Sequence, residues 1–199
     1  MANLERSYDI TLEAFGDALA AKDEGHSKCV TAFSIALARA MGLPYEQIRL
    51  IARGAFLHDL GKLAIPDAIL RKPSGLTPDE LVLIRQSPYR GYQMVKKIPF
   101  LADAAEIVYS HCERFDGTGY PRGLRGEEIP LGARVVAVTR TLDAITSNRP
   151  YRAAQSLQYA REEIESWWGR QFDPEVVKVF LEMPENIWVD LRKEIGART

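Results

Sequence analysis

Apolar residues recur three and four positions apart along this chain, which is the spacing of a buried helix face. Tyr8, Leu12, Phe15 and Leu19 form the first such stripe, and residues 45–58 carry another. No segment shows the strict alternation of apolar and polar residues that is typical of a half-buried β-strand. The sequence therefore predicts an all-α fold.

Turn residues and capping signals divide the chain into helices and loops. Thr77 and Glu80 form a capping box before one helix, and a loop rich in glycine and proline covers residues 114–130. Loops of that length are often functional. The helix within residues 1–21 is either part of the bundle, which we favour, or the end of a linker from a sensor domain. We expect further helices at residues 27–41, 45–58, 78–86, 89–97, 100–111, 132–147, 156–168 and 174–183.

Composition sets the broad class of the chain. Its 199 residues suit one domain, and a hydrophobic share of 46% is enough for a core. A net charge of -1 and a pI of about 6.3 do not indicate binding to nucleic-acid polymers or to a membrane surface. Cys29 and Cys112 could form one disulfide, but no leader or membrane-spanning segment is evident, so we expect a reduced, cytoplasmic protein.

The three histidines, His26, His58 and His111, are candidates for a metal site. His58 is followed directly by Asp59 at a predicted helix end, and imidazole with carboxylate suits hard and borderline divalent metals. The carboxylate can bridge two such ions, and Lys62 could bind a phosphate oxygen. The alternative is that His58 is a hydrogen-bonded helix-terminal residue and Lys62 a solvated charge.

The long glycine-rich loop and the segment after the next helix hold a second group of candidates. Glycines permit backbone conformations that other residues avoid, so Tyr120 would be held with its ring available for stacking and its hydroxyl for hydrogen bonding. Arg149 and Arg152 follow a predicted helix end, and guanidinium groups match phosphate oxygens. The alternatives are an ordinary surface loop and two arginines that cap the helix C-terminus.

Several stretches, in this order, resemble the HD-GYP domain, the branch of the HD phosphohydrolase superfamily that is linked to cyclic di-GMP. The resemblance covers residues 22–183, which leaves residues 1–21 as an N-terminal helix and residues 184–199 as a tail. Ile187, Trp188 and Leu191 give this tail a candidate docking face. The matching segments are GHSKCV (25–30), HDLGKLAIPDAIL (58–70), ERFDGTGYPRGLRGEEIPLGARVVAV (113–138) and DAITSNRPYR (143–152).

The resemblance implies a helical bundle of the HD-GYP type that binds two or three metals, often iron or manganese, and hydrolyses cyclic di-GMP. Such sites activate a water and stabilise charge on the attacked and leaving oxygens. On this chain it implies a metal site made of His26, His58, Asp59 and His111, with Cys112 as an uncertain further ligand. Together with the side-chain chemistry described above, the resemblance implies catalytic roles for Asp59 and Lys62. It also implies nucleotide contacts from Lys62, Tyr120, Arg149 and Arg152.

Three positions depart from the family pattern. Ser87 and Cys112 stand where the family has histidines, and Arg140 stands where it has its last aspartate ligand. A Cys112 thiolate would favour zinc, whereas Ser87 is a poor ligand. Arg140 is a permanent cation near the implied metals, and two unit charges about 4 Å apart repel by about 4 kcal/mol at an effective dielectric constant of about 20. We hypothesise that Arg140 turns inward and pairs with Asp59 in place of a metal; the alternative is that it extends to solvent.

These observations support two functions and a weaker third. We favour a catalytically impaired HD-GYP-like module of cyclic di-GMP signalling, which binds this or a related nucleotide and acts through a homodimer or a sensor or regulatory protein. Such a module need hold no metal. The alternative is an active phosphodiesterase whose altered site holds iron, manganese or zinc. The third is a structural dimerisation domain without a nucleotide site.

Overall fold

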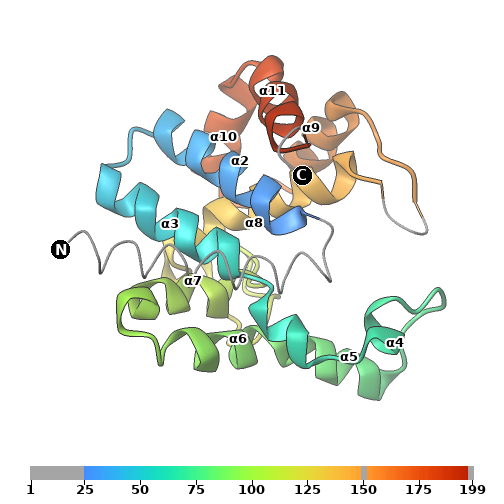
Figure 1. Ribbon diagram of the computed structural model, residues 1–199. Coiled ribbons are helices and arrows are strands. Elements are labelled where there is room, and N and C mark those ends of the chain that lie inside the picture. Colours follow the sequence, from blue (N-terminus) through green and yellow to red (C-terminus); the bar gives the residue numbers. More distant parts are fainter. Residues whose placement is uncertain (1–24, 149–151, 197–199) are drawn as a thin grey trace.

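The computed structural model describes residues 25–148 and 152–196 (Figure 1). The helix predicted within residues 1–21 and the candidate Arg149 lie outside the described residues. Helices and loops make up the described ranges and no strand is formed there, so the all-α prediction is confirmed. The elements are, in chain order, α2 (His26–Ala40), α3 (Tyr45–Leu57), η1 (Leu60–Ala64), α4 (Asp67–Leu70), α5 (Pro78–Arg85), α6 (Ser87–Val95), η2 (Pro99–Ala104), α7 (Ala105–Ser110), η3 (Gly126–Glu128), α8 (Leu131–Thr146), α9 (Leu157–Ser166), α10 (Pro174–Glu182) and α11 (Glu185–Gly196).

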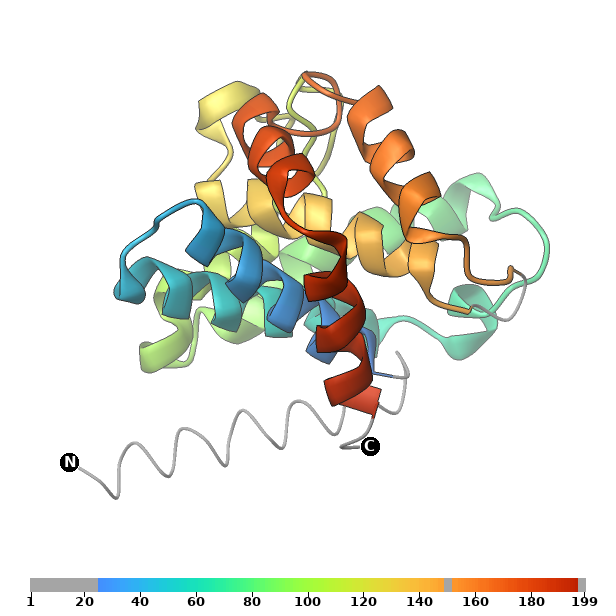
Figure 2. The same cartoon turned by 90° about the horizontal axis from the view of Figure 1, so that it is seen from above.

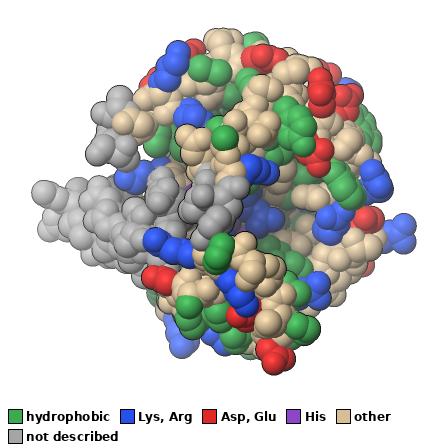
Figure 3. Space-filling view, turned by 90° about the vertical axis from the view of Figure 1, so that its right-hand side faces the viewer, with side chains coloured by type: hydrophobic (Ala, Val, Ile, Leu, Met, Phe, Trp, Pro, Cys, Tyr) green, Lys and Arg blue, Asp and Glu red, His purple; other side chains and the backbone are tan. Residues whose placement is uncertain are grey.

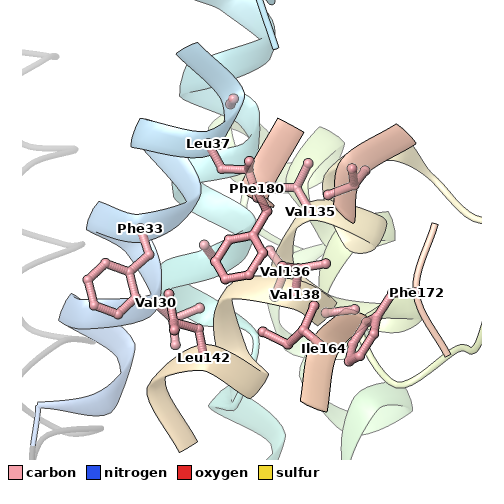
Figure 4. Packing of buried hydrophobic residues seen from close by; sticks show 14 of the residues in the cluster. Val30, Phe33, Leu37, Val135, Val136, Val138, Leu142, Ile164, Phe172 and Phe180 are labelled. Atoms are coloured by element: carbon pink, nitrogen blue, oxygen red, sulfur yellow. The ribbon is translucent and has the colours of Figure 1, made fainter. Parts of the chain in front are cut away.

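Helices α2, α3 and α8 form the centre of the fold, and each packs against the other two. Figure 4 shows Phe33 of α2 in one cluster with Val136 of α8 and Phe180 of α10, and these side chains are at most 1% exposed. Burying an apolar side chain of this size stabilises a fold by roughly 1.5–3 kcal/mol. The cluster therefore sets the positions of α2 and α3, whose ends carry His26 and His58.

A second, smaller core holds the His-Asp segment from the other side. Leu57 and Leu60, which flank His58 and Asp59, are fully buried. They lie in a cluster with residues of α6, η2 and α7, namely Val95, Leu101, Ala105 and Val108. Apolar anchors on both sides of the pair therefore fix where the imidazole and the carboxylate lie.

Close backbone contact between η1 and α6 requires a glycine at position 61. A Cβ atom built on Gly61 would lie 1.8 Å from the carbonyl oxygen of Ser87 and 2.7 Å from the amide nitrogen of Gly91. Both neighbours are backbone atoms of α6, which cannot move without moving the helix. The glycine that follows the His-Asp pair is thus a packing requirement of the site.

We expect Gly61→Ala to lower the free energy of unfolding by about 3 kcal/mol or more, because overpacking here forces α6 away from η1. For a chain of this size that corresponds to a fall in melting temperature of roughly 6–12 °C, measurable by calorimetry. Gly75→Ala is the matched control, since its added Cβ meets nothing within 4 Å. Equal melting temperatures for the two variants would contradict the close contact.

The segment assigned to a C-terminal tail forms α11, which lies across α2 (Figure 2). Trp188 is 2% exposed, and its ring centroid lies 5.5 Å from that of Phe33 and 5.4 Å from that of Phe180. Ile187 and Leu191 pack against the same core, so the face that we identified in the sequence docks on the bundle.

The single helix predicted at residues 100–111 is instead η2 followed by α7. Leu101 and Ala104, three residues apart, are both buried, and a 3-10 helix places residues at that spacing on one side. The capping box of Thr77 and Glu80 is confirmed. None of the described helices combines the length and apolar composition needed to cross a bilayer.

Candidate functional site

Three helix ends bring the three histidines together. His26 begins α2, His58 follows the last residue of α3, and His111 follows the last residue of α7. The ring centroid of His58 lies 5.2 Å from that of His26 and 5.2 Å from that of His111. All three side chains are buried. Residues far apart in the sequence thus form one enclosed imidazole cluster.

The Nδ1 atom of each imidazole is held by an acceptor. His58 and His111 each bond through Nδ1 to the backbone carbonyl three residues earlier, at 2.7 Å in both cases. A carbonyl oxygen can only accept, so these Nδ1 atoms carry the proton. The Nδ1 atom of His26 is hydrogen-bonded to the carboxylate of Asp143. The lone pair therefore lies on Nε2, the tautomer suited to binding a metal.

Asp59 lies against this cluster. Its Oδ2 is 2.6 Å from the Lys62 ammonium and 3.5 Å from Nε2 of His58, while its Oδ1 is 3.9 Å from Nε2 of His111. Among the described residues, His58 Nε2 and Asp59 Oδ1 are buried atoms without a hydrogen-bond partner. Ligand atoms of His26, His58 and Asp59 all lie within 4.8 Å of one another. Buried polar atoms are rarely left unpaired, so this donor set fits a divalent ion.

Burial and neighbouring charges favour the protonation states that bind metal. Burial, helped by the other two histidines and Arg140, lowers the pKa of His58 well below its ordinary value despite the nearby Asp59 carboxylate. Burial raises the pKa of Asp59, but His58, Lys62 and the other histidines outweigh it and hold that pKa well below its ordinary value. The imidazole of His58 is therefore neutral and the carboxylate ionised near neutral pH, the combination that zinc and similar divalent ions bind.

Arg140 does not pair with Asp59, so that hypothesis is wrong. Its Nη1 donates to the sulfur of Cys112 at 3.7 Å, and the partner of Asp59 is Lys62, one turn away in η1. Arg140 does turn inward, because it lines the same cavity as His26 and Asp59. The physical reason is local: Lys62 reaches Asp59 from the same turn, whereas the thiol on the neighbouring segment attracts the guanidinium.

The same surroundings make Cys112 an acidic thiol. Burial by itself raises its pKa, but His111, Arg140 and a hydrogen bond with Tyr120 outweigh that effect and bring the pKa to about 6. Because only the thiolate is nucleophilic, alkylation of metal-free protein should be fast at pH 7 and should slow as the pH falls through about 6. Mass spectrometry of a Cys29→Ser protein, in which Cys112 is the only thiol, measures this rate.

Arg140→Met in that Cys29→Ser background should move the midpoint of alkylation to higher pH, because a charge that favours the thiolate is gone. Arg39→Met, an exposed arginine at the far end of α2, is the control and should leave the midpoint in place. An unchanged midpoint in Arg140→Met, or a midpoint near 8.5 while Arg140 is still present, would contradict the interaction with Arg140.

The glycine-rich loop is held to the cluster by Glu113 and Cys112. The buried carboxylate of Glu113 accepts hydrogen bonds from the backbone N–H groups of Arg122, at 2.8 Å, and Leu124, at 3.2 Å. Tyr120 shares a side-chain hydrogen bond with Cys112, and the Arg85 guanidinium lies 5.7 Å from the centre of its ring. Tyr120 therefore reaches the histidines through Cys112 and is not itself part of the cavity wall described below.

Two other predicted positions differ in what they contact. Ser87 uses its hydroxyl to bond the carbonyl of Ile84 at 2.8 Å, so it acts as a local helix contact. Arg152 lines the cavity beside the cluster and donates to the carbonyl of Ala144, at the end of α8. The sequence predicts a substituted ligand position at Ser87 and a nucleotide contact at Arg152.

A cavity of about 580 Å³ opens beside His26 and Asp59. Its basic wall consists of Lys62, Arg140 and Arg152, and Figure 3 shows basic side chains gathered in a hollow on this side of the molecule. Clefts of this size hold small organic ligands. Other lining residues come from α9 and the segment after it, and no sequence motif marks them: Tyr159, Glu163, Trp167, Gln171 and Phe172.

Comparison with known proteins places this architecture in a family. The family model described as HD domain matches residues 13–176. The chain belongs to the HD domain family. Of the solved structures similar to this HD domain, a cyclic GMP-AMP specific phosphodiesterase of V. cholerae (V-cGAP3) has a TM-score of 0.72 at 19% identity, over 94% of this chain and 52% of its own. Bd1817, an HDG"Y"P protein from Bdellovibrio bacteriovorus, has a TM-score of 0.64 at 25% identity, over 77% of this chain and 49% of its own.

Two relatives by sequence carry related descriptions. A cyclic di-GMP phosphodiesterase of Thermotoga maritima is 41% identical over 171 residues, which are 85% of this chain and 46% of that protein. The cyclic di-GMP phosphodiesterase response regulator RpfG of Xanthomonas campestris pv. campestris is 39% identical over 186 residues, which are 91% of this chain and 49% of that protein. The resemblance to HD-GYP proteins is thereby confirmed, and this HD domain spans about half the length of these relatives.

Proposed function

We propose that this HD domain hydrolyses a phosphodiester bond of a cyclic dinucleotide at a metal held by His26, His58 and Asp59. The observation that carries the proposal is the pair of buried, unpaired ligand atoms, His58 Nε2 and Asp59 Oδ1, in a cluster whose ligand atoms lie within 4.8 Å of one another. Relatives described as phosphodiesterases for cyclic di-GMP and 3'3'-cGAMP support the substrate class.

His26 and His58 would hold the ion through Nε2 and Asp59 through its carboxylate, with His111 and the thiolate of Cys112 as further candidates. When bound, such an ion polarises a phosphate oxygen and lowers the pKa of a water, which is the chemistry that phosphodiester hydrolysis needs. Iron, manganese and zinc all accept this mixture of ligands. The catalytic role of Asp59 would be to supply a negative charge that attracts the metal ion to the site.

Basic residues on the cavity wall would bind the phosphates. The ammonium of Lys62 forms an ion pair with Asp59. The Lys62 side chain is nevertheless 37% exposed, so it can also reach a phosphate oxygen. Arg152 lines the same cavity. We propose that these two charges orient the substrate, together with Arg149 and Tyr120.

The test is metal analysis of the purified chain combined with an assay on cyclic di-GMP and 3'3'-cGAMP. We expect at least one equivalent of iron, manganese or zinc and a linear dinucleotide or mononucleotide product, with turnover lost in chelator and restored by added metal. A chain that holds metal but cleaves neither dinucleotide, or one that binds no metal at all, would contradict this function.

A second candidate function is a nucleotide-binding module without hydrolysis, which would act through a homodimer or a sensor or regulatory protein. The position of Arg140 favours it, because a permanent cation lines the cavity beside Asp59 and opposes a dication. The Lys62–Asp59 ion pair also neutralises part of the charge that a metal would meet. Calorimetric binding of cyclic di-GMP in chelator, with no product after prolonged incubation with metal, would establish this function.

A further inference from the structure

A line of polar contacts runs from the C-terminal helix α11 to the histidine cluster. Arg192 of α11 lies 2.9 Å from Oδ1 of Asp143, which also accepts a hydrogen bond from Ser147 at 3.1 Å. The other oxygen of Asp143 is bonded to Nδ1 of His26. The side chain of Asp143 is 1% exposed, so its contacts with protein groups decide its state.

His26 needs such a partner because of its place in the fold. His58 and His111 stand at helix ends, where a carbonyl of their own helix three residues earlier accepts from Nδ1. His26 is the first residue of α2, so no carbonyl of that helix lies three residues before it. Its acceptor comes from α8, as Asp143, and the charge that supports this acceptor comes from α11.

Arg192 is held in one orientation. Its guanidinium donates to the hydroxyls of Ser147 and Thr146, both at 2.7 Å, and lies 5.3 Å from the ring centre of Phe33. A planar guanidinium held in this way keeps its N–H groups directed at the carboxylate of Asp143. Helix α11 lies beyond residues 13–176, the part that the HD-domain model matches, so the family model does not cover this contact.

We infer that Arg192 is a positioning residue that, through Asp143, fixes the tautomer and the orientation of His26 for metal binding. The inference rests on the proposed function for the metal itself. A carboxylate held by Arg192 accepts from Nδ1–H, so Nε2 of His26 keeps its lone pair toward the cluster. Without the arginine, the buried carboxylate loses this charge-assisted contact and is no longer held in one orientation. His26 is then no longer held in the tautomer that binds metal.

The test uses Arg192→Met in the whole chain, with two measurements. In metal-free protein labelled with ¹⁵N-histidine, we expect His26 to change from a single Nδ1–H tautomer to a mixture. We also expect the dissociation constant for Mn²⁺, measured by chelator competition, to rise about tenfold or more, the usual effect of losing a group that orients a ligand. Arg192→Lys, which keeps the charge, should recover most of both properties.

Arg161→Met is the matched control. Arg161 also docks a helix, since it donates to the carbonyls of Leu181 and Met183 and lies 5.7 Å from the ring centre of Phe180. Its loss should lower the melting temperature while Mn²⁺ affinity stays within twofold and the His26 tautomer is unchanged.

Two results would overturn the inference. One is an Arg192→Met protein with a single His26 tautomer and unchanged Mn²⁺ affinity. The other is an equal loss of both properties in Arg161→Met, which would make Arg192 merely structural. If the unaltered chain binds no metal, the proposed function fails, and the tautomer of His26 in the metal-free variants still decides whether Arg192 positions it.

Discussion

Asp59→Asn should abolish metal binding and, with it, cleavage of cyclic dinucleotides. Asp59 is the only carboxylate in the cluster of ligand atoms identified among the described residues, and its surroundings keep it ionised. Loss of groups that merely orient a ligand weakens metal binding 10–100-fold, so we expect a loss of at least about a hundredfold for the ligand itself. Metal content of purified protein and the rate of dinucleotide cleavage both measure this loss.

Asp103→Asn is a suitable control for that experiment, because it removes one negative charge from an exposed position in η2. It should leave both metal content and turnover within about twofold. Equal metal content in the Asp59→Asn and unaltered proteins would show that the ion, if present, is held elsewhere. Circular dichroism should confirm that the variant keeps its helices, since the substitution conserves side-chain volume.

Arg140→Asp should strengthen metal binding about a hundredfold or more and raise the turnover of cyclic dinucleotides. The guanidinium lines the cavity beside Asp59, so the substitution replaces a repulsive charge with an attractive one. A unit charge about 4 Å from another is worth about 4 kcal/mol at an effective dielectric constant of about 20, and about 1.4 kcal/mol is a factor of ten in affinity. A hundredfold change corresponds to about 2.8 kcal/mol, which is about two thirds of that energy.

Two further variants separate the causes in the Arg140 experiment. Arg140→Met removes the positive charge without adding a ligand, so it should recover part of the gain. Arg39→Asp makes the same change of charge at an exposed site and should alter affinity less than about threefold. If Arg140→Asp binds metal no better than the unaltered chain, the guanidinium does not oppose the ion, and the second candidate function loses its main support.

Most of the fold follows from local sequence signals. Helical spacing predicts α3, and the capping box of Thr77 and Glu80 predicts the start of α5, because both depend on residues within a turn or two. The spacing at residues 100–111 predicts one helix where η2 and α7 form, since the preference for a 3-10 turn comes from burial against α3 and α6. Likewise, the helical form of residues 185–196 depends on docking Trp188 beside Phe33.

The sequence alone determined the all-α class, the family and the candidate ligands, because helical periodicity and short motifs are carried by residues close together in the chain. Only the tertiary structure decided which charges meet. His26 and Asp143 are 117 residues apart, and Arg140 and Cys112 are 28 apart, so no local pattern predicts either contact. An ionic partner is chosen by distance and burial in three dimensions, which is why Asp59 pairs with Lys62 and Arg192 of the last helix reaches the site.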